Sequence, residues 1–272
     1  METVELFKQY LEQLFAGKRS GARELLFDAH DRGFGADRLL SSIIWPAMEQ
    51  IDKLHRDGHI TAIVEHMATR INRMVADQLH SVLNRKPKDG RRVVVFCGAS
   101  EAGELGAQIS SDLFEADGWS VWFVGAGIAN DDALRFLGDV TPDVLLIYGS
   151  LPTEVPGVRK LIALIREVGV CQDMQIMVCG GVYSRVEELA EEIKADLCAK
   201  NIRDALVLSE KYPSRVPRED VPEPGRRRKR KRKVKNPRVP ELRRELGIED
   251  AEELEEEEPI DEEVTVSSAA GE

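Results

Sequence analysis

The chain has 272 residues, of which 42% are hydrophobic and 32% charged, and its formal net charge is −11. This composition allows one or two domains with a buried core, and the acidic balance argues against a folded body that binds nucleic acid or acidic membranes. The sequence has no run of 18 or more apolar residues, and its start lacks a basic segment followed by an apolar one. We therefore expect a cytoplasmic protein that does not enter a membrane.

Apolar residues recur at helical spacing from residue 1 to 84, as Leu6, Tyr10 and Leu14 illustrate. The pattern predicts four or five helices packed as a bundle. Glycine-containing breaks are expected at 17–21, 33–35 and 57–58. Pro46 is expected in the first turn of a helix or at a kink.

The pattern changes after a polar linker at residues 85–90, and an α/β domain is predicted from 91 to 212. Short apolar runs predict strands at 93–96, 121–124, 144–148, 176–179 and 196–198. Helices are expected between them at 104–117, 131–138, 158–167 and 186–194. Continuously apolar strands that alternate with helices indicate a parallel sheet covered on both faces, and such sheets bind ligands beyond the carboxyl ends of their strands.

Residues 213–272 carry 14 basic and 17 acidic residues together with several prolines, so this tail is predicted to be disordered, with a short helix possible at about 241–257. Any nucleic acid would have to bind through the eight consecutive basic residues Arg226 to Lys233. The acidic residues that follow compete with that role, so a tail that regulates solubility or docks a protein partner is an equal alternative.

The four cysteines, Cys97, Cys171, Cys179 and Cys198, form no Cys-x-x-Cys pair and lie in apolar segments. They are interpreted as buried thiols rather than as a metal site or a disulfide framework.

The loop after the first predicted strand reads Glu101-Ala-Gly-Glu-Leu-Gly106. It resembles the Asp/Glu-x-His-x-x-Gly loop of the cobalamin-binding domain that methionine synthase, corrinoid methyl carriers and light-sensing cobalamin regulators share. In that family the histidine coordinates cobalt from below, and here Gly103 stands in its place. The resemblance therefore implies a cobalamin site without its lower protein ligand. The family's acidic residue positions that histidine; for Glu101 and Glu104, a role at the start of the following helix is the alternative.

The resemblance continues in two later loops. The family's Ser-x-Leu corresponds to Gly149, Ser150 and Leu151, with glycine at the serine position, and the family's Gly-Gly corresponds to Gly180 and Gly181. In the family these loops line the channel for the nucleotide tail of the cofactor, which implies that role here. The alternative is that the glycines only permit tight strand-to-helix turns.

The helical half resembles the cap that covers the upper face of cobalamin, whose signature is a tryptophan, nine residues and then Glu-His. Glu65 and His66 are present, and His55 stands at the tryptophan position. Trp45 is interpreted as a core aromatic rather than as a substitute lid. His55 or His66 could ligate a metal, although a solvated histidine is the default interpretation.

The predicted fold class is α/β: an N-terminal helical bundle cap, a flavodoxin-like (Rossmann-type) parallel sheet and a disordered charged tail. The leading hypothesis is a non-enzymatic sensor or regulatory protein that binds cobalamin, or a related tetrapyrrole such as haem. A degenerate, cofactor-free protein-interaction module is the second hypothesis. A corrinoid methyl-carrier subunit of a methyltransferase system is the third.

Overall fold

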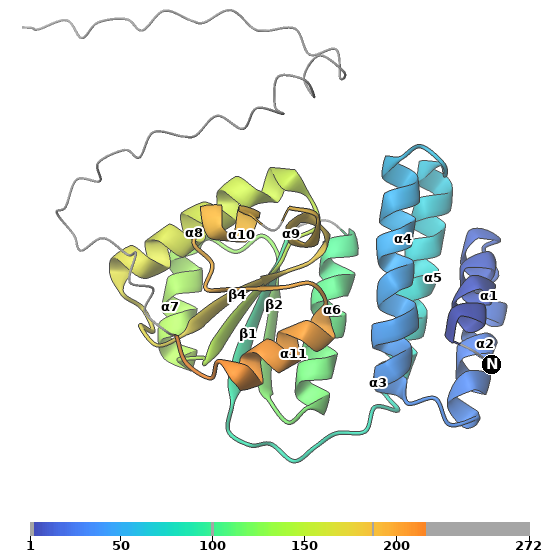
Figure 1. Ribbon diagram of the computed structural model, residues 1–272, viewed down its shortest axis with the longest axis horizontal. Helices are drawn as coiled ribbons and strands as arrows, with labels where there is room; N and C mark the ends of the chain where they lie inside the picture. The colour runs from blue at the N-terminus through green and yellow to red at the C-terminus, as the bar shows by residue number, and fades with distance from the viewer. Residues whose placement is uncertain (1–2, 99–100, 187, 216–272) are drawn as a thin grey trace, which may run out of the picture. The chain divides into compact units, whose positions relative to one another are not determined.

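The computed structural model describes residues 3–98, 101–186 and 188–215 (Figure 1). The side chain of Glu101 and all residues after 215 lie outside this description, and the predictions made for the charged tail and for its basic run at 226–233 fall there. No helix in the described ranges combines the length and the apolar character that crossing a membrane requires.

The first part of the chain is helical, as predicted. Its elements are α1 (Thr3–Phe15), α2 (Arg19–Asp31), α3 (Ala36–Leu39), a π-helical turn (Leu40–Ile44), α4 (Trp45–Arg56) and α5 (Ala62–His80). The three predicted breaks are confirmed. Gly33 and Gly58 have φ values of +99° and +74°, which glycine adopts without steric cost. Helix α5 then begins where the Thr61 hydroxyl accepts a hydrogen bond from the N–H of Val64 at 3.4 Å.

The π-helical turn lies directly before Trp45, and Pro46 occupies the first turn of α4, which confirms the expectation for this proline. The buried Asn72 of α5 holds the turn in place. Its amide nitrogen donates to the carbonyl of the last residue of the turn at 3.1 Å, and its oxygen accepts from the Tyr10 hydroxyl at 3.0 Å. Such turns are frequent at functional sites.

The second part is a five-stranded parallel sheet in the order β2-β1-β3-β4-β5, which is the flavodoxin-like order. Its strands are β1 (Arg92–Cys97), β2 (Ser120–Gly125), β3 (Val144–Tyr148), β4 (Gln175–Cys179) and β5 (Leu197–Ala199). The five predicted strands are confirmed to within a residue or two. The chain passes from β1 to β2 on one side and then places β3 on the other, so the carboxyl ends of β1 and β3 border the crevice where this fold binds ligands.

The connecting helices are α6 (Glu101–Ala116), α7 (Asn130–Val140), α8 (Val155–Val168), α9 (Gly181–Arg185), α10 (Glu188–Glu192) and α11 (Ile202–Lys211). The helix predicted at 186–194 is confirmed as the shorter α10. Helix α9 before it was not predicted, and it ends at Val186, which is extended with φ −133° and ψ 88°. Helix α11 was not predicted, although Asn201 is a recognisable helix cap whose side chain accepts from the N–H of Asp204 at 3.0 Å.

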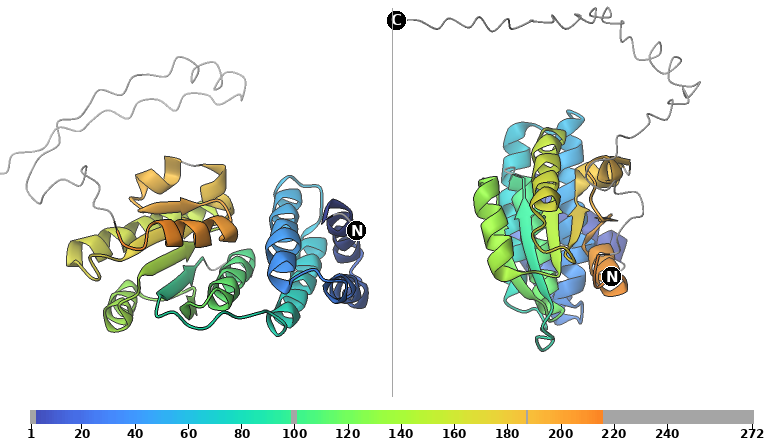
Figure 2. Two further views of the ribbon diagram at one scale, coloured as in Figure 1. Left: turned by 60° about the horizontal axis from the view of Figure 1, so that its bottom comes forward. Right: turned by 90° about the vertical axis from the view of Figure 1, so that its left-hand side faces the viewer.

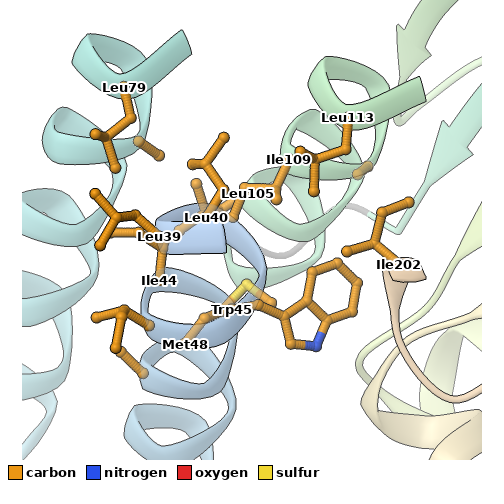
Figure 3. Close-up of a cluster of buried hydrophobic side chains, with 14 of the residues drawn as sticks. Leu39, Leu40, Ile44, Trp45, Met48, Leu79, Leu105, Ile109, Leu113 and Ile202 are labelled. Atoms are coloured by element: carbon orange, nitrogen blue, oxygen red, sulfur yellow. The ribbon is translucent and has the colours of Figure 1, made fainter. Parts of the chain in front are cut away.

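Alternating strand residues build two hydrophobic cores, because successive side chains point to opposite faces of a sheet. Val93 and Val95 share a core with residues of α6 and α11, whereas Val94 and Phe96 share one with residues of α7 and α8. Figure 2 shows helices on both sides of the sheet. The first core extends without interruption into the helical bundle. Figure 3 shows the side chains that join them: Leu39, Leu40, Ile44, Trp45, Met48 and Leu79 from the bundle, Leu105, Ile109 and Leu113 from α6, and Ile202 from α11. Bundle and sheet therefore belong to one compact unit.

Candidate functional site at the carboxyl end of the sheet

The first loop follows β1 and leads into α6, where Gly103 is buried in the first turn. The carboxylate of Glu154 lies between this loop and the loop after β3, to which it belongs. Glu154 accepts hydrogen bonds from the backbone N–H groups of Ser150 and Leu151, each at 3.2 Å, and a Cβ built on Gly98 would lie 1.9 Å from its Oε1 atom. Ser150 is buried, whereas Leu151 is 39% exposed. The two loops thus close on each other around a side chain that sequence reasoning did not single out.

Two tyrosine rings occupy the space that the loop glycines leave open. A Cβ on Gly106 would lie 2.2 Å from Cζ of Tyr148, and one on Gly180 would lie 3.0 Å from the same atom. On the other face, a Cβ on Gly149 would lie 2.8 Å from Cε2 of Tyr183. Both tyrosines are buried, and burial raises the pKa of each phenol well above its ordinary value, so both remain neutral.

Trp45 covers Tyr148 from the bundle side. The two rings meet edge to face, with centroids 5.5 Å apart and planes at 85°. The indole is 2% exposed, and its Nε1 donates to Oε1 of Glu49 at 3.0 Å. Burial raises the pKa of the Glu49 carboxyl, and the hydrogen bond from Trp45 opposes that rise. The interpretation of Trp45 as a core aromatic is confirmed, and the residue also seals the carboxyl end of β3.

A pocket of about 200 Å³ remains between α4 and the loops. Its lining residues are Met48, Glu49, Asp52, Lys53 and Arg56 from α4, and Tyr148, Ser150, Gly181, Ser184 and Arg185 from the sheet side. Arg185 spans the pocket, because its Nη2 donates to the carbonyl of Ser150 at 3.0 Å and its Nη1 lies 3.7 Å from Oδ2 of Asp52. The pocket therefore combines an aromatic floor with carboxylates and guanidinium groups at its rim.

The candidate residues of the helical half stay apart from this pocket's lining. His55 and His66 are exposed, and Glu65 accepts a hydrogen bond from the Thr69 hydroxyl at 3.4 Å and lies 3.7 Å from the His66 ring. Within the described residues, histidine, cysteine and carboxylate side chains form no group of three that could hold a metal ion.

Polar pairs between α5 and α6 flank the apolar contact of bundle and sheet, and sequence reasoning did not single them out. His80 Nδ1 lies 2.8 Å from Oδ1 of Asp112, and Arg73 Nη2 lies 3.3 Å from Oε2 of Glu104. Burial raises the pKa of Asp112 to about 6, although His80 favours its charged form. Spacing along the chain gives no signal for such pairs, because their members are about 30 residues apart.

None of the four cysteines forms a disulfide bond. Only Cys179 is buried and the other three are half-buried, so the prediction of burial holds for that one residue. Burial raises the pKa of Cys97 to about 11, which keeps it a thiol at neutral pH.

Cobalamin fits this arrangement only in part. The rim of the pocket offers acceptors and donors that suit a ligand edged with amide groups. Its volume of about 200 Å³, however, lies below the roughly 300–1,000 Å³ of pockets that hold drug-sized ligands. The space beside the loop glycines, which would admit a nucleotide tail, is filled by the rings of Tyr148 and Tyr183. The corrin macrocycle and its tail therefore do not fit while α4 lies against β3, and no chemical step through cobalt follows from this arrangement.

The fold and the site define a flavodoxin-like domain whose ligand-binding edge is covered by a helical bundle. Residues 6–80 match the family model described as B12 binding domain. The chain is 23% identical over 163 residues to dimethylamine corrinoid protein 1 of Methanosarcina acetivorans, covering 58% of this chain and 75% of that one. It is 24% identical over 103 residues to dimethylamine corrinoid protein 3 of Methanosarcina mazei, covering 38% of this chain and 60% of that relative.

Among solved structures, the Methanosarcina barkeri monomethylamine corrinoid protein superposes with a TM-score of 0.67 at 18% identity, covering 77% of this chain and all of that one. That likeness establishes the shared fold. The family match over residues 6–80 and the corrinoid-protein relatives confirm the resemblance to the cobalamin-binding domain family that was drawn from the sequence.

Proposed function

We propose that the protein is a corrinoid-binding protein without catalytic activity of its own, which acts as a sensor or regulator. The observation that carries the proposal is the placement of α4, part of the segment that matches the B12 binding domain, across the carboxyl end of the sheet. Ligands of open α/β sheets bind at that edge. A bound corrinoid would supply the redox chemistry of cobalt.

The residues of this chain would act as a hinged clamp around the ligand. Because the pocket is small, the ligand enters when α4 moves away from β3 and Trp45 leaves Tyr148. Glu49, Asp52 and Arg185 then present charged groups to the rim of the macrocycle. Such a movement couples occupancy of the site to the packing of the bundle, which is what a sensor requires.

Two other functions, a protein-interaction module and a methyl-carrier subunit, are each supported by one observation. The tyrosine rings that fill the loop glycines favour a cofactor-free protein-interaction module. The curated relatives, named corrinoid proteins, favour a methyl-carrier subunit, which additionally requires a methyltransferase partner.

The test is gel filtration with visible spectroscopy, performed in the dark on the full chain with adenosylcobalamin, methylcobalamin and, separately, haem. Co-elution of a corrinoid with a shifted spectrum, together with a change in elution volume, supports the sensor. Binding without any change of shape, but with methyl exchange alongside a methyltransferase, supports the carrier. Absence of a bound chromophore leaves the interaction module.

A pair of tryptophan variants tests the site itself. Trp45→Ala removes the ring that closes the pocket and is expected to strengthen corrinoid binding or speed its onset. Trp122→Ala is the matched control, because Trp122 packs against the opposite core, on the face of α7 and α8. Equal behaviour of the two variants would contradict a ligand site beneath α4.

A further inference from the structure

The loop glycines of this chain are packed against its own aromatic rings. Tyr148, at the end of β3, projects from the sheet towards α6, and its ring fills the space beside both Gly106 and Gly180. Tyr183, in α9, fills the space beside Gly149 from the other core. A Cβ closer than 3.0 Å to a ring atom is a contact that real structures avoid, and two of these three positions fall below that limit.

The rings of Tyr148 and Tyr183 leave no room for another planar group, such as a heterocyclic base, beside these glycines. Close-packed interiors leave few voids larger than a water molecule, so a heterocyclic base could enter only if a tyrosine left. The contacts of Tyr148 with Gly106 and Gly180 lie within the sheet domain, so they remain when Trp45 moves away with α4. The nearby pocket lies beyond this plug, since its lining includes Tyr148, Ser150 and Gly181 but none of the glycines that face the rings.

We infer that a corrinoid held by this protein keeps its nucleotide tail outside the sheet. The inference rests on the proposed function and specifies its ligand class: corrinoids are recognised by their macrocycle, so tailless forms such as cobinamide are ligands equal to cobalamin. Gly103 is consistent with this mode, because a glycine offers no side chain to replace the tail's own base on the metal.

The experiment compares the binding of aquocobinamide and hydroxocobalamin to the full-length protein by spectroscopic titration. Dissociation constants that agree within about threefold are expected, because the tail makes no buried contact. Electron paramagnetic resonance of the bound cobalt(II) form of cobalamin gives a second readout. Nitrogen splitting from the tail's own base is expected to persist, since nothing draws that base away from the metal.

Cobalamin that binds more than about tenfold tighter than cobinamide, with loss of the nitrogen splitting, would overturn the inference and leave the proposed function standing. Failure of both corrinoids to bind would overturn the proposed function and the inference with it.

Two variants sharpen the comparison. Tyr148→Leu opens the space beside Gly106 and is expected to shift the preference towards cobalamin. Tyr212→Leu, at the end of α11 where the chain contacts the amino end of β4, is the matched control and is expected to leave the preference unchanged. An unchanged preference in a folded Tyr148→Leu protein would overturn the role of this ring as the plug.

Discussion

The contact between Gly106 and Tyr148 predicts that Gly106→Ala destabilises the natural protein but stabilises a Tyr148→Leu protein. Alanine at position 106 would place a Cβ 2.2 Å from Cζ and 2.6 Å from both Cε1 and Oη of the buried Tyr148 ring. Gly106 lies inside α6, where alanine by itself favours the helix by about 1 kcal/mol. Overpacking a filled core costs about 1–3 kcal/mol. The clash outweighs the helix preference over most of this range, and we expect Gly106→Ala to lower the free energy of unfolding by up to about 2 kcal/mol.

A matched control at Gly138 and a Tyr148→Leu protein separate the helix preference of alanine from its clash with the Tyr148 ring. Gly138→Ala, inside α7, meets no described atom within 4 Å and should raise the free energy of unfolding by about 0.5–1 kcal/mol. In a Tyr148→Leu protein the ring is absent, so Gly106→Ala should become stabilising by a similar amount. The coupling energy between the two positions is then about 2 kcal/mol, within the range measured for residues in contact.

The assay is urea unfolding followed by far-ultraviolet circular dichroism and tryptophan fluorescence, with equal m values required across all the proteins compared. Additivity of the two substitutions to within about 0.5 kcal/mol would refute the packing of Tyr148 against this glycine. It would also remove the ring packing from which we infer that tailless corrinoids bind as tightly as cobalamin.

Three further outcomes follow from the same structure. Because burial raises the pKa of Asp112 from 3.8 to about 6, the folded protein retains a proton that the unfolded chain loses between about pH 4 and 6, and stability falls as pH rises through that window. Asp112→Asn should flatten this part of the pH profile of urea midpoints, and an unchanged slope would assign it elsewhere. Cys97, with a pKa raised to about 11, should react with iodoacetamide at pH 8 roughly 100-fold more slowly than an exposed thiol, which peptide mass mapping can measure. Asn72→Ala leaves the Tyr10 hydroxyl and a carbonyl of the π-helical turn without their partner, so urea unfolding should show a loss of about 2–4 kcal/mol; a loss under about 1 kcal/mol would mean that the turn holds without Asn72.

The sequence alone determined the two-part organisation, the parallel sheet and the resemblance to the cobalamin-binding domain family. Strands such as Val93–Phe96 and Val144–Tyr148 were visible because buried parallel strands are continuously apolar, a property of adjacent residues. Glycine breaks such as Gly33 were visible for the same reason, since the backbone conformation they permit is local. Gly103 was visible as a missing ligand because the motif around it spans only six residues.

The tertiary structure alone decided what fills the site. Tyr148 lies more than 40 residues from Gly106 and more than 100 from Trp45, and nothing in the spacing of the chain brings the three together. The pairing of His80 with Asp112 is equally invisible in sequence, and the pKa of Asp112 is raised to about 6 only because tertiary packing buries this residue of α6. The local conformational preferences of residues and the spacing of hydrophobic residues indicate which residues form a helix or strand. Which rings occupy a space depends on the packing of elements that are distant in sequence, and that packing exists only once the bundle and the sheet have met.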